Sequence, residues 1–233
     1  MKYYNLISNF CNNLKIEFNE EIYNKIIFYT KQLITYNEKF NLTAITDEES
    51  IIKRHFLDSI SFFNCNIAKE SKICDVGTGA GFPGIPIKIL RNDLNIDLIE
   101  ISNKKVEFLK HIIEILDLSN INIIRERVEN VSHETLYREK YDIVTSRAVS
   151  RLDKLLELSF ALVNTNGKLI AFKGINFYDE IIESIKVMNL MGGEFEKAVY
   201  LKEFNSSLVV IKKIKETPTI YPREYKKILK KSL

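Results

Sequence analysis

The chain has 233 residues, of which 45% are hydrophobic, 11% aromatic and 28% charged, and its formal charge at neutral pH is +3. This balance is typical of a globular protein with a substantial core and argues against a disordered chain. No apolar run approaches the roughly 18 residues that a membrane-spanning helix needs, and the start of the chain lacks the pattern of a secretory signal. We therefore expect a cytoplasmic protein with no membrane partner.

Cysteine and histidine usage gives no sign of a metal centre. Cys11, Cys65 and Cys74 are spaced like neither a disulfide framework nor a zinc site, so we predict that they are small buried hydrophobic residues. The three histidines are scattered along the chain. The sequence therefore predicts no metal site.

Positive charge is concentrated at the end of the chain. Residues 215–233 carry six Lys or Arg and two Glu, a net +4, whereas the preceding chain has a net charge of −1. Two interpretations stay open. The segment is either a solvated basic tail, in keeping with the chain's general richness in Lys, or a segment attracted to a polyanion such as RNA, where phosphate contacts release counterions.

The chain up to about residue 68 has a helical pattern. Within 20–40, apolar residues recur at three- and four-residue spacings, which predicts an amphipathic helix; they are Ile22, Ile26, Tyr29, Leu33 and Tyr36. A further helix is expected after Thr46 or Asp47, because either side chain can cap its first turn. We predict an N-terminal helical module over residues 1–68 that packs directly on the rest of the chain.

After residue 70, short apolar runs alternate with helical segments. The predicted strands are 72–76, 96–101, 121–126, 141–147 and 167–173, followed by strand-like runs at 194–203 and 207–214. The predicted helices are 83–91, 103–116, 151–163 and one near 177–191. The alternation predicts an α/β fold with a doubly wound, mostly parallel seven-stranded Rossmann-like sheet. Because no helix separates the last two runs, they are expected to form an antiparallel hairpin.

The stretch DVGTGAGFPGIP, residues 75–86, follows the first predicted strand and opens the first predicted helix. Open α/β sheets bind nucleotides at this position, beyond the carboxyl ends of their strands. Gly77, Gly79 and Gly81 have no Cβ, so the backbone can adopt positive φ and a ligand can approach closely. A glycine-rich turn without a ligand is the alternative interpretation.

Glycine spacing discriminates between nucleotide classes. The dinucleotide fingerprint requires G-x-G-x-x-G, but the sixth position counted from Gly77 is Phe82. Asp75 and the following G-x-G-x-G instead resemble the first motif of S-adenosylmethionine-dependent methyltransferases. Glu100 stands at the end of the second predicted strand, where a carboxylate can accept hydrogen bonds from both ribose hydroxyls of an adenosyl group. Taken alone, Glu100 also fits a solvated charge.

Further segments, in the same order, make the resemblance specific. The chain resembles the RsmG family, also called GidB, of 16S ribosomal RNA guanine-N7 methyltransferases. The matching segments are YNEKFNLTAI (36–45), RHFLDSI (54–60), DVGTGAGFPGIP (75–86), NKKVEFL (103–109), ERVEN (126–130), SRAVSRL (146–152), AFKG (171–174) and TPTIYPR (217–223). Two positions depart from the family pattern. The family often has Asp where Glu100 stands, and EFNSSLVVIKK lacks the Arg that commonly precedes the last strand.

The resemblance implies methyl transfer from S-adenosylmethionine, without a metal, to N7 of a specific guanosine in the decoding region of 16S rRNA, guanine-527 in the family. It assigns residues 69–214 to the cofactor-binding methyltransferase domain. The cofactor-binding residues that it implies are Asp75, Gly77, Gly79, Gly81, Phe82, Glu100, Val128, Glu129 and Arg147. Because strand ends share one rim of such a sheet, these residues can converge. Val128 as core filler and Glu129 as an acid at a helix start are the plainer alternatives.

Guanine N7 has a lone pair and no proton, so its methylation needs no general base, and positioning should dominate catalysis. The predicted catalytic residues are Arg147 and Lys173, because Arg or Lys pairs well with the O6 and N7 edge of guanine. The predicted RNA contacts are Arg54, His55, Arg151 and Lys173. As alternatives, Arg151 fits a solvated charge and His55 a helix residue hydrogen-bonded to Asp58.

Three function classes remain for comparison. The first is a monomeric enzyme that methylates small-subunit ribosomal RNA, alone or in a ribosomal subunit. The second is a nicotinamide-dependent oxidoreductase, against which the glycine spacing argues. The third is a non-catalytic RNA-binding module with the same fold.

Overall fold

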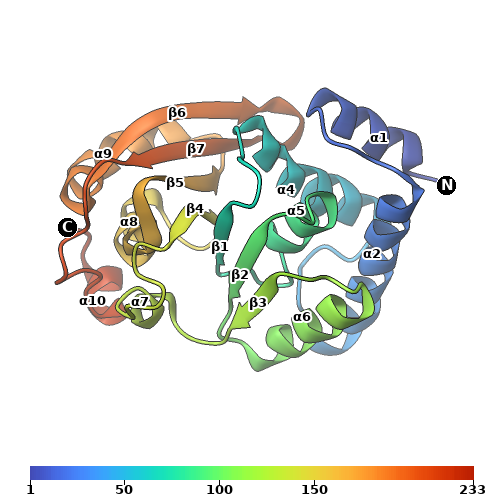
Figure 1. The fold of residues 1–233 in the computed structure, drawn as a ribbon, viewed down its shortest axis with the longest axis horizontal. Helices are drawn as coiled ribbons and strands as arrows, with labels where there is room; N and C mark the ends of the chain where they lie inside the picture. The colour runs from blue at the N-terminus through green and yellow to red at the C-terminus, as the bar shows by residue number, and fades with distance from the viewer. The chain divides into compact units, whose positions relative to one another are not determined.

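The structure is a computed structural model that describes residues 1–233 (Figure 1). Its seven-stranded sheet has the order β3-β2-β1-β4-β5-β7-β6. The strands are β1 (Lys72–Val76), β2 (Asn95–Ile99), β3 (Ile121–Ile124), β4 (Tyr141–Arg147), β5 (Val163–Lys173), β6 (Gly193–Leu201) and β7 (Ser206–Lys213). Strand pairs β2–β3, β1–β4 and β4–β5 are parallel, whereas β5–β7 and β6–β7 are antiparallel. The predicted mostly parallel sheet with a terminal hairpin is confirmed.

The chain divides into two compact units, each built from two stretches of sequence. The first comprises Met1–Glu70 and Thr78–Arg125, and the second comprises Ser71–Gly77 and Glu126–Leu233. The helical segment 1–68 thus belongs to the same unit as the two strands β2 and β3. The three-part division at 1–68, 69–214 and 215–233 stays a prediction.

The first unit is mainly helical. Its helices are α1 (Tyr4–Asn13), α2 (Glu20–Phe40), α3 (Glu48–Ser50), a π-helix (Ile51–Leu57), α4 (Asp58–Ile60), a 3-10 turn (Ser61–Asn64), α5 (Gly84–Leu90) and α6 (Asn103–Ile115). The side chain of Asn19 caps α2 by accepting from the Ile22 N–H at 2.9 Å. Asp47 caps α3 by accepting from the Ser50 N–H at 2.8 Å, as predicted. Helix α2 packs along α6, beside it in Figure 1.

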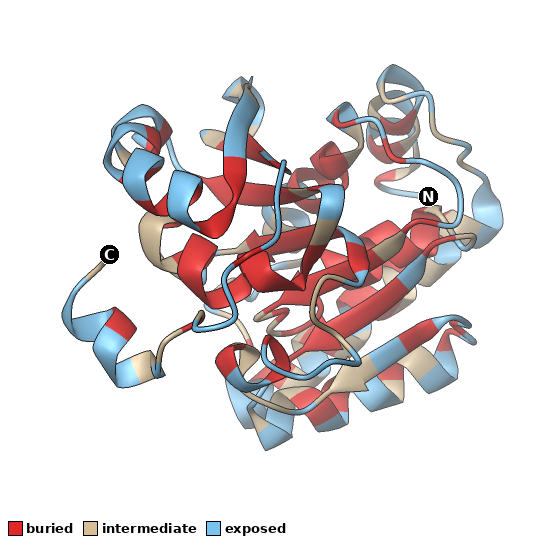
Figure 2. Cartoon of the chain, turned by 60° about the vertical axis from the view of Figure 1, so that its left-hand side comes forward, coloured by how far each residue is buried: buried red, intermediate tan, exposed pale blue.

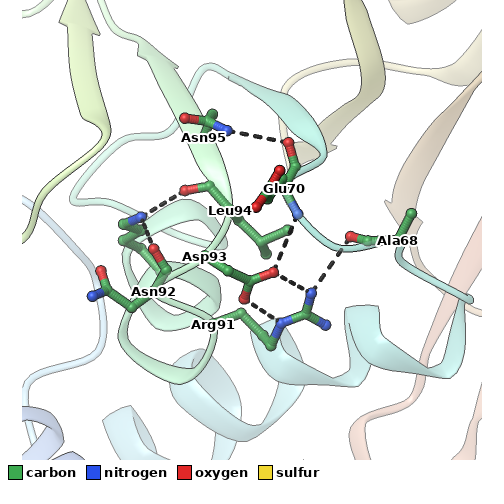
Figure 3. Close-up of polar contacts among 8 residues, drawn as sticks. Ala68, Glu70, Arg91, Asn92, Asp93, Leu94 and Asn95 are labelled. Atoms are coloured by element: carbon green, nitrogen blue, oxygen red, sulfur yellow. Dashed lines mark hydrogen bonds and ion pairs between the residues drawn. The ribbon is translucent and has the colours of Figure 1, made fainter.

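A polar cluster closes the carboxyl end of α5 (Figure 3). Arg91 makes a two-pronged ion pair with Asp93, with both N–O distances at 2.6 Å, and this hydrogen bonding lowers the pKa of Asp93 to about 2. The fully buried Lys88 donates from Nζ to the carbonyls of Asn92 and Leu94, at 2.7 and 2.6 Å. These side chains hold the segment that leaves α5, together with a backbone hydrogen bond from the Leu94 N–H to the Arg91 carbonyl.

The second unit contains five strands and the remaining helices. These are α7 (Val128–Val131), α8 (Leu152–Ser159), a 3-10 turn (Phe160–Leu162), α9 (Phe177–Met191), a 3-10 turn (Lys202–Phe204) and α10 (Tyr225–Lys230). Helices α8 and α9 pack against each other. Strand β5 lies between β4 and β7, and its residues from Leu169 to Phe172 are buried. Figure 2 shows that buried residues predominate in some strands, whereas the helices alternate buried and exposed residues.

The segment after β7 is bound to the second unit rather than extended from it. The Arg138 guanidinium donates to four carbonyls, those of Ser132, Thr217, Pro218 and Tyr221, at 2.8–3.1 Å. The Arg223 guanidinium makes two hydrogen bonds to Glu157, at 2.6 and 2.7 Å, and the Arg223 backbone N–H makes a third at 3.2 Å. The helix α10 that follows was not predicted from the sequence.

Several element boundaries differ from the sequence-based expectation. Strands β2 and β3 end at Ile99 and Ile124, so Glu100 follows β2 instead of ending it. Strand β5 begins at Val163, because a 3-10 turn replaces the last part of the predicted helix 151–163. All three cysteines are buried and free, as predicted. None of the helices has the length and apolar character needed to cross a bilayer.

Candidate functional site

In the first unit, the glycine-rich loop after β1 forms a tight turn around Thr78. The Thr78 N–H donates to the carbonyl of Ile99 at the end of β2 (3.1 Å), and the Thr78 carbonyl accepts from Gly81 and Phe82 (3.0 and 2.9 Å). Gly79 and Gly81 have φ of +64° and +105°. At Gly81 an added Cβ would lie 2.5 Å from Ile85 Cγ1 and 3.1 Å from the Tyr29 hydroxyl oxygen. This part of the loop excludes side chains for both conformational and steric reasons.

Glu100 is bound to that loop. Its carboxylate accepts from the Gly79 N–H at 3.0 Å and from the Ser102 N–H at 2.8 Å, and Lys105 Nζ lies 3.9 Å away. The residue is only 7% exposed. Because a carboxylate has about four lone-pair sites, acceptor capacity remains beyond these two N–H groups. The interpretation of Glu100 as a solvated charge is therefore wrong.

An aromatic cluster supports the loop from α2 and the π-helix. The buried Tyr29 hydroxyl donates to the carbonyl of Ala80 at 2.7 Å, and the Tyr29 and Phe82 ring centroids are 5.4 Å apart. The imidazole of His55 stacks on Phe82 at 4.6 Å. The Phe82 side chain is thus buried between two rings of the N-terminal helices, which ties those helices to the loop.

The π-helix carries the predicted RNA-binding residues of this unit. Arg54 is exposed and His55 is half-buried. His55 Nε2 shares a hydrogen bond with Thr43 Oγ1 at 2.8 Å. π-helical turns are uncommon and occur frequently at functional sites. The position of Arg54 suits a surface contact, whereas His55 has a packing role in addition to any contact it makes.

In the second unit, β1 ends at Val76, directly before Gly77, the first glycine of the loop. Asp75 is fully buried and lies opposite Thr145 of β4 in the sheet register. Gly77 has φ of +67°, and a Cβ added there would lie 2.5 Å from Val149 Cγ2. Val149 therefore occupies the space that a side chain at position 77 would need.

The loop after β4, residues 148–151, follows one predicted site residue and ends with another. Arg147 is the half-buried last residue of β4, and Arg151 precedes α8 on the surface, where it forms an ion pair with Glu183. Lys173, the last residue of β5, donates to the carbonyl of Ser150 at 2.6 Å and forms an ion pair with Glu180 at 2.8 Å. Burial lowers the pKa of Lys173, and the Glu180 carboxylate acts in the opposite direction.

Helix α7 begins with the two residues expected to hold adenine. Val128 is half-buried, and Glu129 is 7% exposed in the first turn, where the Arg127 Nε group donates to its carboxylate. The Arg127 guanidinium also lies 4.3 Å from the ring centroid of Tyr225. A side chain that pairs with its neighbour fits the plainer interpretation of Glu129 as a helix-start acid, and its adenine contact stays a prediction.

Each unit brings together part of the predicted set. In the first, Gly79, Glu100 and the Phe82 backbone share one hydrogen-bonded turn. In the second, Val149 of the loop after Arg147 lies against Gly77, and Lys173 donates to the Ser150 carbonyl of the same loop. Sequence reasoning missed Tyr29 and Glu180. In the sequence, Tyr29 is only one residue of an apolar helix face. Glu180 is only an acid near the start of a predicted helix.

Solved structures resemble this fold at low sequence identity. An S-adenosylmethionine-dependent methyltransferase from Aquifex aeolicus matches with a TM-score of 0.53 at 15% identity, covering 70% of this chain and 92% of that one. A variant of MtNAS in complex with S-adenosylmethionine matches with a TM-score of 0.56 at 13% identity, covering 81% and 76%. The fold is thus the Rossmann-like fold of the S-adenosylmethionine-dependent methyltransferases.

Sequence comparison identifies the family. Residues 22–216 match the family model described as rRNA small subunit methyltransferase G. Proteins named ribosomal RNA small subunit methyltransferase G from Clostridium kluyveri and Clostridium tetani are 43% and 40% identical, over 96% and 100% of both chains, respectively. The chain therefore belongs to the rRNA small subunit methyltransferase G family.

Proposed function

We propose that this protein transfers a methyl group from S-adenosylmethionine to N7 of one guanosine in the decoding region of 16S ribosomal RNA, guanine-527 in the family. Family membership supports the class of substrate. The observation that carries the cofactor assignment is the glycine loop, whose Gly79 N–H is bound to the nearly buried carboxylate of Glu100. That carboxylate holds the loop and retains acceptor capacity for hydroxyl groups.

The residues present fit an adenosyl cofactor. The main chain carries no side chain at Gly79 and Gly81 in the first unit and at Gly77 in the second. The Glu100 carboxylate suits the two ribose hydroxyls because it is acceptor-only when ionised. Asp75, Phe82, Val128 and Glu129 remain proposed cofactor contacts, with Phe82 contributing its backbone, because its ring is packed against Tyr29 and His55.

Methyl transfer to guanine N7 requires little of the chain beyond positioning the methyl donor and the base. S-adenosylmethionine supplies an electrophilic methyl group, and guanine N7 presents a lone pair that carries no proton. Correct orientation of such a pair can contribute up to about 7–11 kcal/mol to lowering the barrier. Arg147 is the proposed contact to the guanine O6 and N7 edge or to the cofactor carboxylate, since a guanidinium suits either group.

Contact with RNA is proposed for the exposed cations of both units. Arg54 and Arg151 present guanidinium groups on the surface, and phosphate contacts by such groups give affinity that falls with salt. Lys173 is a weaker candidate for direct contact, because two of its three N–H donors are used within the chain. A ribosomal RNA substrate supports a cytoplasmic location for the enzyme.

The experiment is methyl transfer from radiolabelled S-adenosylmethionine to small subunits that lack the modification, to free 16S rRNA and to large subunits. We expect label in small-subunit rRNA, and mass spectrometry of the digested RNA should locate it on N7 of one guanosine. Label on another atom or base would refute the N7 assignment. RNA binding without label would favour the non-catalytic module, and a fluorescence titration that detects NADH binding would favour the oxidoreductase.

A further inference from the structure

Four groups around the carboxyl end of β5 form one continuous set of polar contacts. Lys173 Nζ donates to the Ser150 carbonyl at 2.6 Å and lies 2.8 Å from Glu180 Oε2. The same Glu180 oxygen accepts from the Leu152 N–H at 2.8 Å. Lys173 is 8% exposed, and the side chain of Glu180 is 21% exposed. One ion pair therefore binds the Ser150 carbonyl in the loop after β4 and the Leu152 N–H at the start of α8.

We propose that Glu180 is a positioning residue for methyl transfer, which acts with Lys173 to hold loop 148–151 against the glycine loop at Gly77. This inference rests on the proposed function for its catalytic consequence. Nothing in the residue pattern of α9 distinguishes Glu180 from Asp179, the other acid in its first turn, so the assignment comes from the contacts alone.

The loop needs such support because its own backbone is strained and irregular. Ala148 has φ of +58°, a left-handed conformation that alanine rarely adopts. Such conformations persist only where the surrounding structure holds them. Lys173 and Glu180 supply that support at the far end of the loop, at Ser150 and Leu152.

The position of the loop matters because Val149 lies against Gly77. Val149 Cγ2 occupies the space that a Cβ at position 77 would need, with a separation of only 2.5 Å. The loop also sets the positions of Arg147, which precedes it, and of Arg151, its last residue. A shift of the loop would therefore move the surface beside the bare backbone at Gly77 and the two guanidinium groups together.

A positioning pair and a direct RNA contact predict different kinetics. If the pair acts together, Glu180→Gln and Lys173→Met each lower kcat by about 10- to 100-fold, the scale expected for a displacement of about 1 Å. The double variant is then no worse than the more impaired single variant, because both substitutions remove one interaction. Asp179→Asn removes a charge from the same helix turn at an exposed position and should keep the activity of the original protein.

The outcomes separate the two roles. Full activity of Glu180→Gln, with loss only in Lys173→Met, would overturn the proposal in favour of direct contact by Lys173. Losses that multiply in the double variant would also overturn it. Thermal unfolding of each variant identifies any that fail to fold, and Glu180→Ala serves as a second variant for the same comparison.

Hydrogen exchange gives a measurement that needs no substrate. The Leu152 amide is bound to the Glu180 carboxylate, so Glu180→Gln and Glu180→Ala should exchange faster at Leu152 and in loop 148–151, while β5 stays protected. Asp179→Asn should match the original protein, and unchanged exchange in the Glu180 variants would refute the contact. If the original protein transfers no methyl group, the proposed function fails, and exchange alone decides whether Glu180 holds the loop.

Discussion

At the residue scale, Gly81 combines a positive φ with a crowded surrounding. Its φ is +105°, and an added Cβ would lie 2.5 Å from Ile85 Cγ1. We expect Gly81→Ala to lower the free energy of unfolding by about 1–3 kcal/mol, the cost of holding a non-glycine residue in such a conformation. Gly174→Ala is the matched control, because no atom lies within 4 Å of a Cβ built there. Urea unfolding measures both, and equal stability of the two variants would contradict the expectation.

Glu100 offers a test of the cofactor assignment. Glu100→Gln keeps the shape of the side chain but replaces the charge that the Gly79 and Ser102 N–H groups bind. The same charge is proposed to accept from the ribose hydroxyls of the cofactor. Hydrogen bonds to charged groups contribute about 1.5–3 kcal/mol, so affinity for S-adenosylmethionine should fall roughly 10- to 100-fold. Isothermal titration calorimetry measures the change. Glu107→Gln, at a position where the side chain is 72% exposed, should bind as before; similar affinity in both variants would remove Glu100 from the site.

Residues differ in how far the sequence reveals their role. Glu100 was predictable because its distance from the glycine loop and its place after β2 restrict what it can contact. Tyr29 was not, since its hydroxyl reaches the Ala80 carbonyl across 51 positions of sequence, and such a long-range contact leaves no local pattern. His55 shows the same limitation, because its stacking on Phe82 depends on how the π-helix packs.

At the element scale, the end of α5 contains a buried lysine whose protonation depends on folding. Burial lowers the pKa of Lys88 from 10.5 to about 8. Between these values the unfolded chain keeps the proton that the folded chain has released, so unfolding takes up a proton, and the free energy of unfolding rises with pH. The gain is at most about 1.4 kcal/mol for each pH unit.

Lys88→Met tests this dependence. Its stability relative to the original protein should decline as pH increases from 8 to 10, because the variant lacks the Lys88 ammonium whose release of a proton stabilises the original protein in this window. Urea unfolding at several pH values gives the comparison, with Lys110→Met, exposed on α6, as the control that should follow the original profile. Parallel profiles for Lys88→Met and the original protein would contradict a low pKa for Lys88.

At the scale of the whole molecule, the C-terminal segment contributes to the stability of the second unit. The Glu157 carboxylate is 1% exposed and is bound by the Arg223 guanidinium, whose side chain is 27% exposed. Arg223→Ala would leave a buried charge without its partner, and we expect a loss of about 3 kcal/mol in the free energy of unfolding. Lys227→Ala, which removes an exposed pair with Glu224, should cost below about 1 kcal/mol. A loss for Arg223→Ala no larger than this control would contradict the prediction.

The role of the positive charge on this C-terminal segment is tested by substitution rather than by truncation. Removing residues after Ile214 would also remove Arg223 and Thr217, which bind Glu157 and Glu139. Replacing the exposed Lys226, Lys227, Lys230 and Lys231 by Gln keeps those contacts. If the lysines bind RNA, the slope of log affinity against log salt should decrease by about 0.7–0.9 for each phosphate that the variant no longer neutralises. An unchanged slope would leave the solvated tail as the correct interpretation.

The sequence by itself determined the order and type of the main elements, the seven-stranded sheet and the family. This was possible because strand and helix periodicity, glycine spacing and capping residues are local patterns that the chain carries before it folds. Only the tertiary structure decided that Tyr29 holds the glycine loop, that Glu180 and Lys173 bind loop 148–151, and that Arg223 covers Glu157. These contacts join residues far apart in sequence, and packing geometry rather than local pattern selects the partner of each buried polar group.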